Sequence, residues 1–102
     1  MEITAGMSAV VTGGASGMGR SISLALAGRG VHVAVVDIDE SAARSTAAEV
    51  AATGVRSLAR TVDVASCEQV ESMAAEVWSE FGGIDILANN AGVAQYLRRC
   101  GL

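Results

Sequence analysis

The chain has 102 residues and a mass of 10.3 kDa, which predicts one small domain with a single modest hydrophobic core. Hydrophobic residues make up 51% of the chain and charged residues 18%, so the composition is globular and excludes disorder caused by excess charge. The net charge of -4, the scattered arginines and the absence of lysine exclude a basic footprint for nucleic acid or anionic membrane, and every mechanism that needs a lysine amine.

Segments rich in β-branched residues alternate with helical patterns along the chain. Strands are predicted over residues 8–12, 31–36, 55–64 and 84–88. Helices are predicted over about 18–27, ending at Gly28, and about 40–53, ending at Gly54. A third helix follows Ser66 and ends at Gly82. Strands separated by helices of this length need right-handed crossovers, so we expect a parallel sheet with helices on its faces.

The third helix carries the clearest periodicity. Its apolar residues form one stripe at helical spacing: Val70, Met73, Ala74, Val77, Trp78 and Phe81. Ser66 followed by Gln69 predicts a capping box at the start of this helix. The stripe predicts that Trp78 and Phe81 lie in the core.

A glycine-rich turn, residues 12–19 (TGGASGMG), joins the first strand directly to the first helix. Glycines let the backbone bend tightly and approach a pyrophosphate, while free N–H groups and the helix dipole supply positive potential without lysine. A flexible loop is the alternative interpretation. The position between strand and helix favours a phosphate-binding turn.

Asp37 closes the second strand, 18 residues after Gly19, where the adenosine ribose of a dinucleotide would lie. A carboxylate there accepts hydrogen bonds from both ribose hydroxyls and repels a 2′-phosphate, and no basic residue follows at position 38 or 39. The alternative role for Asp37 is N-cap of the next helix, for which Asp39 is an equally good candidate.

Thr12-Gly13-x-x-x-Gly17-x-Gly19, together with Asn89-Asn90-Ala91-Gly92, resembles the short-chain dehydrogenase/reductase family. The approach to the fourth strand, residues 81–87, is also similar, so the resemblance covers about residues 8–92. It implies a Rossmann-like doubly wound α/β fold, here truncated to four parallel strands in the order 3-2-1-4 and three helices. Residues 1–92 are then the dinucleotide-binding half-domain of an oxidoreductase acting on alcohols or ketones, and residues 93–102 are a tail of unknown structure.

The resemblance also implies the cofactor-binding residues. The pyrophosphate turn would be lined by Gly13, Ser16, Gly17, Met18 and Gly19. Asp37 would hold the ribose, which gives NAD preference over NADP, and Asp63 and Val64 would contact the adenine. Asn90, Ala91 and Gly92 would lie against the adenosine-side ribose and brace the sheet. From the residues alone, Asp63 follows a parallel strand and is expected in the ligand crevice, with a turn-forming role as the alternative. The asparagines are better explained, from the residues alone, as turn-forming residues.

No catalytic residue is assigned. The family's catalytic tyrosine and lysine occur as Tyr-x-x-x-Lys, whereas the only tyrosine here, Tyr96, is followed by Leu97, Arg98, Arg99 and Cys100. Arginine does not replace that lysine, because its pKa is too high to relay a proton. We therefore expect this chain alone to be inactive, as a fragment, a frameshifted product or a natural short form. A noncatalytic nucleotide-binding or interaction module is the alternative function, and the glycine spacing disfavours a Rossmann-like methyltransferase.

Three further expectations concern location and partners. The first residues show no basic region and no segment approaches the length of a membrane span, which predicts a soluble cytoplasmic protein without membrane contact. Cys67 and Cys100 match neither a disulfide framework nor a zinc spacing, so no metal site is expected. The strand at 84–88 would be an exposed sheet edge with few blocking charges, which predicts self-association.

Overall fold

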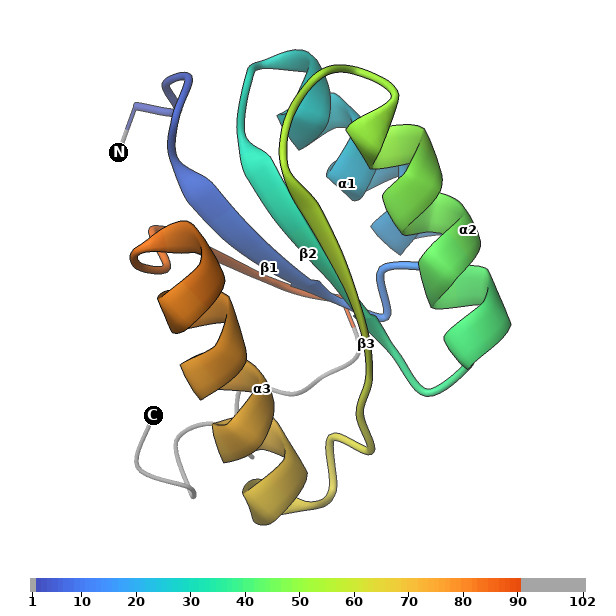
Figure 1. Cartoon of the computed structure of the whole chain (residues 1–102). Helices are drawn as coiled ribbons and strands as arrows, with labels where there is room; N and C mark the ends of the chain where they lie inside the picture. The colour runs from blue at the N-terminus through green and yellow to red at the C-terminus, as the bar shows by residue number, and fades with distance from the viewer. Residues whose placement is uncertain (1, 91–102) are drawn as a thin grey trace.

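Strands and helices alternate in the computed structural model, which describes residues 2–90 (Figure 1). The elements in chain order are β1 (Ser8–Thr12), α1 (Gly17–Gly28), β2 (His32–Asp37), α2 (Glu40–Ala51), β3 (Ser57–Thr61), α3 (Cys67–Phe81) and β4 (Ile86–Asn89). The strands form one sheet in the order β3-β2-β1-β4, and every pair is parallel. The predicted fold class and strand order are confirmed.

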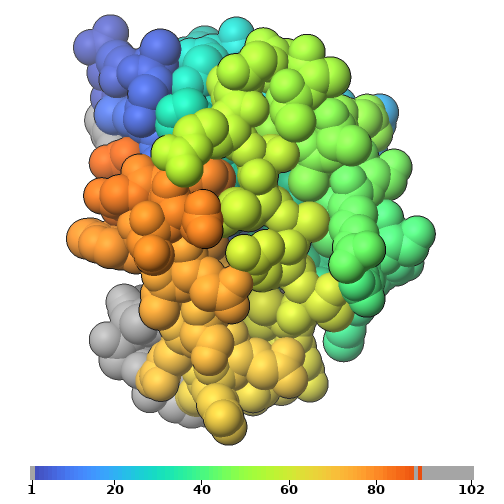
Figure 2. Space-filling view, viewed as in Figure 1, coloured from blue at the N-terminus to red at the C-terminus, as the bar shows by residue number. Residues whose placement is uncertain are grey.

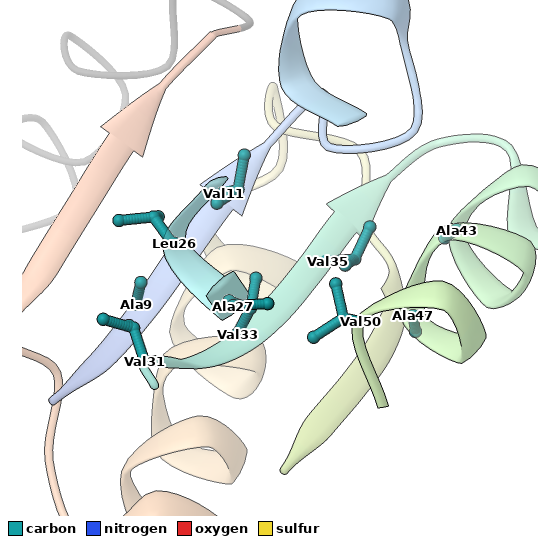
Figure 3. Close-up of a cluster of buried hydrophobic side chains, with 10 residues drawn as sticks. All are labelled: Ala9, Val11, Leu26, Ala27, Val31, Val33, Val35, Ala43, Ala47 and Val50. Carbon is teal, nitrogen blue, oxygen red and sulfur yellow. The ribbon is translucent and has the colours of Figure 1, made fainter. Parts of the chain in front are cut away.

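The helices cover both faces of the sheet. In Figure 1, α1 and α2 lie on one face and α3 on the other. Successive side chains of a strand point to opposite faces, so Val11 packs toward α1 and α2 whereas Val10 packs toward α3. The larger core cluster, drawn in Figure 3, comprises Ala9, Val11, Leu26, Ala27, Val31, Val33, Val35, Ala43, Ala47 and Val50. Strands β1 and β2 are thus buried on both faces, as expected for central parallel strands.

The fourth strand begins later than predicted, at Ile86 rather than residue 84. The reason is Asp85, whose carboxylate Oδ2 accepts a hydrogen bond from the Ser8 N–H at 2.9 Å. The Asp85 N–H in turn donates to the Ser8 carbonyl at 2.9 Å. The Asp85 carboxylate therefore accepts the Ser8 N–H, which in a regular ladder would bond to a backbone carbonyl of the neighbouring strand. Regular pairing between β1 and β4 starts one residue later, with Ala9 opposite Ile86.

Trp78 is 60% exposed, so its predicted place in the core is wrong. Val70, Met73 and Val77 are the buried residues of α3. At 3.6 residues per turn Trp78 lies about 80° around the helix from Val70, at the margin of the apolar stripe. Helix α3, coloured gold to orange, faces the viewer in Figure 2. No helix among residues 2–90 is long and apolar enough to cross a membrane.

Candidate functional site

The candidate site lies at the edge of the sheet where the parallel strands end. The register pairs Thr12 with Val36 and with Asn89, and Asp37 with Thr61. The loops that leave β1, β2 and β3 therefore begin side by side. This is the edge at which open parallel sheets bind ligands, because strand termini and helix N-termini converge there.

The glycine turn is closed by two tight backbone approaches. Gly13 has φ of +61°, in the left-handed region that favours glycine. A Cβ at Gly19 would lie 2.0 Å from the Gly13 carbonyl oxygen, and one at Gly14 would lie 2.8 Å from the Val11 oxygen. The start of α1 therefore packs directly on the turn. Gly14 was not among the predicted site residues, and its tight contacts are with the Val11 carbonyl of β1 and the Val35 side chain of β2.

Gly17 differs from these glycines. A Cβ built there meets no atom of the described chain within 4 Å, and Met18 beside it is 70% exposed. Ser16 occupies the N-cap position of α1 but makes no capping hydrogen bond; its hydroxyl donates to the Gly13 carbonyl at 2.8 Å. In contrast, α2 and α3 are capped by the side chains of Asp39 and Ser66. Of these three helices, α1 alone has a first turn without a side-chain cap.

Asn90 ties the end of β4 to the glycine turn. Its side-chain amide Nδ2 donates to the Gly13 carbonyl at 3.2 Å and to the Ser16 hydroxyl at 3.0 Å. The Thr12 hydroxyl adds a long hydrogen bond, 3.4 Å, to the Ala88 carbonyl. These contacts hold the turn in one conformation from the side of β4. Ala91 and Gly92, the other predicted residues of this segment, lie outside the described residues.

Asp37 joins the glycine turn to the loop after β2. Its Oδ2 accepts from the Ala15 N–H and its Oδ1 from the Asp39 N–H, each at 3.1 Å. The N-cap of α2 is Asp39, whose Oδ1 accepts from the Ala42 N–H at 3.1 Å, so the capping role considered for Asp37 belongs to its neighbour. A pocket of about 230 Å³ lies beside Asp37 and is lined by Ala15, Ser16, Asp37, Asp39 and Ala42.

Asp63 forms a turn and also lines a pocket. Its Oδ1 accepts from the Ala65 N–H at 3.0 Å, which is the turn-forming role that its sequence context allows. The Asp63 N–H donates to Gln69 Oε1 at 2.8 Å, so Gln69 does not complete the predicted capping box with Ser66. A second pocket, of about 170 Å³, is lined by Gly13, Val36, Asp37, Ile38, Val62, Asp63 and Val64.

Ile38 is a wall of the second pocket that sequence reasoning missed. Its side chain is 71% exposed, although it directly follows a buried strand. An apolar residue immediately after the strand-ending aspartate was the available signal. A larger hollow, of about 410 Å³, lies between β3 and α3, where Arg60 Nε pairs with Glu76 Oε2 at 2.5 Å. It contains none of the predicted site residues that lie within residues 2–90, so the candidate site is assigned to the smaller pockets.

Comparison with known proteins gives a consistent result. The family model described as short chain dehydrogenase matches residues 7–99. The chain is 45% identical over 85 residues to the probable oxidoreductase EphD of Mycobacterium tuberculosis, covering 83% of this chain and 14% of that protein. It is 44% identical over 89 residues to the 3-oxoacyl-[acyl-carrier-protein] reductase FabG of Staphylococcus aureus, covering 86% and 36%.

Solved structures agree with these matches. A crystal structure of NAD⁺-bound xylitol dehydrogenase superposes with a TM-score of 0.81 at 31% identity, over 84% of this chain and 33% of that one. A hydroxysteroid dehydrogenase from Escherichia coli gives 0.80 at 32% identity, over 83% and 36%. The chain thus spans 14% and 36% of the length of the two relatives named above. It belongs to the short chain dehydrogenase family.

Proposed function

We propose that this chain is the NAD-binding portion of an oxidoreductase that transfers hydride between the nicotinamide and an alcohol or ketone. The observation that carries the proposal is the position of Asp37, whose carboxylate bridges the glycine turn and the end of β2 beside a pocket. When bound, the nicotinamide would accept or supply the hydride.

The pyrophosphate would lie over the glycine turn at the start of α1. The open space at Gly17 leaves room for a close ligand, and the uncapped first turn of α1 leaves N–H donors for phosphate oxygens. Gly13 and Gly19 would shape the turn, and Ser16 and Met18 would flank it. Met18 is exposed on the helix side of this space.

The adenosine ribose would lie against Asp37. Each carboxylate oxygen accepts one backbone N–H in the chain and keeps a lone pair for a ribose hydroxyl. Among residues 2–90, no basic residue lines the adjoining pocket. A 2′-phosphate would therefore meet a negative charge without compensation, which favours NAD over NADP.

The adenine would occupy the pocket between the loops after β2 and β3. Ile38 and Val64 provide apolar walls, and Asp63 would accept a hydrogen bond from the exocyclic amine. Asn90 would act through the turn that it braces, with Ala91 and Gly92 beside the ribose. Support for this placement comes from the neighbour solved with NAD⁺ bound, whose fold superposes on this chain.

Titration calorimetry of the chain with NAD and with NADP tests the proposal. NAD is expected to bind more tightly by about 1 to 3 kcal/mol, which corresponds to roughly 5- to 150-fold. Asp37→Arg should reverse the preference, while Glu71→Arg, which makes the same change of charge at an exposed residue of α3, should leave it unchanged. Equal or tighter NADP binding by the unmodified chain would contradict the role of Asp37.

Turnover by the chain alone is not expected, because none of its residues matches a tyrosine–lysine proton relay. NADH formation from alcohols should stay at the level of a buffer blank. Robust turnover by purified chain that is lost in Tyr96→Phe would contradict this expectation. NAD binding without turnover also fits a noncatalytic nucleotide-binding module, and hydride transfer on adding the catalytic segment of a relative would distinguish the two.

A further inference from the structure

We propose that Asp39 is a second specificity-determining residue, which acts with Asp37 to reject a phosphate at the 2′ position of the adenosine ribose. The inference rests on the proposed function. It goes beyond that function because it divides the coenzyme preference between two carboxylates with different positions, one at the end of β2 and one at the N-terminus of α2.

The two carboxylates share one pocket. Asp39 and Asp37 both line the space of about 230 Å³ beside the glycine turn. They are also linked directly, because the Asp39 N–H donates to Asp37 Oδ1 at 3.1 Å. Asp39 is exposed, so its charge faces solvent and any ligand that enters the pocket. A phosphate on the ribose would therefore meet two negative charges.

Asp39 also occupies the donors that would otherwise attract that phosphate. The N-terminus of a helix binds anions through free N–H groups and its dipole. Here Asp39 Oδ1 takes the Ala42 N–H, and Asp37 takes the N–H groups of Asp39 and Ala15. Glu40, also in the first turn, is paired with Arg44 and so adds no net charge there. The positive end of α2 is thus neutralised by the chain's own carboxylates.

The arginines of α1 and α2 are paired with glutamates, and Arg44 lines a neighbouring pocket of about 630 Å³ together with Asp39. Arg44, one turn into α2, pairs with Glu40 at 2.6 Å. Arg20 in α1 forms two hydrogen bonds with the Glu49 carboxylate. Neither arginine lines the shared pocket. Neutralising Asp37 alone would therefore leave a capped helix and a full negative charge at Asp39, and discrimination against NADP would persist in part.

The test measures the ratio of NADP to NAD dissociation constants in the chain, in Asp37→Asn, in Asp39→Asn and in the double variant. Asparagine keeps the N-cap, so Asp39→Asn removes charge without uncapping α2. Each single substitution should lower the ratio by about threefold to tenfold, and the double variant should lower it further than either. The Asp39 contribution should shrink at high salt, because an exposed charge is screened.

A matched control variant and two possible outcomes decide whether Asp39 contributes to the discrimination against NADP. Glu71→Gln removes an exposed charge from α3, on the other face of the sheet, and should leave the ratio unchanged. If Asp37→Asn changes the ratio but Asp39→Asn never does, alone or in the double variant, the inference is wrong and the proposed function stands. If the unmodified chain binds neither NAD nor NADP, the proposed function itself fails.

Discussion

The glycines of the turn have different physical reasons to be glycine. At Gly19 and Gly14 the constraint is internal, because a side chain would collide with the backbone of the turn or of β1. At Gly17 the described chain imposes no such constraint. A glycine that the fold does not need is explained if a ligand approaches closely there.

Gly17→Ala should therefore leave folding intact and weaken NAD binding about tenfold or more, equal to about 1.4 kcal/mol. Thermal melting of the variant checks that it folds, and titration calorimetry on the same sample measures its affinity for NAD. Gly28→Ala is the matched control, because Gly28 also has open space but lies at the far end of α1. Gly19→Ala should instead destabilise the fold by about 2 kcal/mol or more. Unchanged NAD affinity in a well-folded Gly17→Ala chain would refute the close approach.

At this scale the sequence predicted which residues gather at the site but not all of their contacts. The turn glycines and Asp37 carry a local signal, since they sit at the junctions of predicted elements. The hydrogen bonds of Asn90 join residues 77 and 74 positions apart, and no local pattern specifies such partners. Likewise, only the three-dimensional geometry assigns the α2 cap to Asp39 rather than Asp37.

Helix α3 illustrates what patterning predicts for an element. Its start at the Ser66 cap and its end at Gly82, in the left-handed conformation, follow the sequence signals. The spacing of its apolar residues wrongly predicted that Trp78 lies in the core. Such spacing identifies the apolar stripe of a helix, but it does not show how far the sheet covers the margin of that stripe. The shortened β3, Ser57–Thr61 rather than 55–64, is a similar case at the edge of the sheet.

Substitutions on α3 should show that residues in the middle of its apolar stripe contribute more to stability than residues at the margin of the stripe. Val77 is fully buried, so Val77→Ala should lower the free energy of unfolding by about 2 kcal/mol. Trp78→Ala should have a smaller effect, although far more side-chain volume is removed, because the indole is mostly exposed in the described chain. Urea denaturation of both variants provides the comparison. A larger loss for Trp78→Ala would mean that the indole is covered in solution.

The ion pair between α1 and α2 should make stability depend on pH in acid. Hydrogen bonding from Arg20 holds the pKa of the Glu49 carboxyl below its ordinary value of 4.5, with a further Coulombic contribution. A lowered folded pKa stabilises the fold above the unfolded pKa, and this contribution is lost as pH falls through the folded pKa. Both side chains are substantially exposed, at 49% and 38%, so the effect is small and salt-sensitive. Melting curves of Glu49→Gln should show a flatter acid limb than the parent, and identical limbs would contradict the assignment.

The whole molecule follows from the alternation of strands and helices. Once the elements are predicted, right-handed crossovers and burial of both sheet faces restrict the topology strongly, and family resemblance supplied the strand order. What the sequence does not specify is how the outer strand is covered. Among the described residues β4 pairs with β1 alone, and Leu87 is 44% exposed.

We propose that this edge promotes self-association, because an unpaired strand edge with apolar side chains is a template for further pairing. Light scattering after size-exclusion chromatography should show a mass that rises with concentration. Leu87→Lys should reduce that rise, whereas Glu68→Lys, a charge change on exposed α3, should not. A concentration-independent monomer of 10.3 kDa with a cooperative melt would refute the proposal.

The central claim is that a dinucleotide binds where the parallel strands end, and amide chemical shifts during an NAD titration test it most directly. The amides of Gly13, Gly17 and Asp37 should shift together and saturate with one dissociation constant. Gly30 and Gly54, which precede β2 and β3 at the opposite edge, are matched glycine reporters and should not move. Shifts confined to the opposite edge, or none at saturating NAD, would contradict the account.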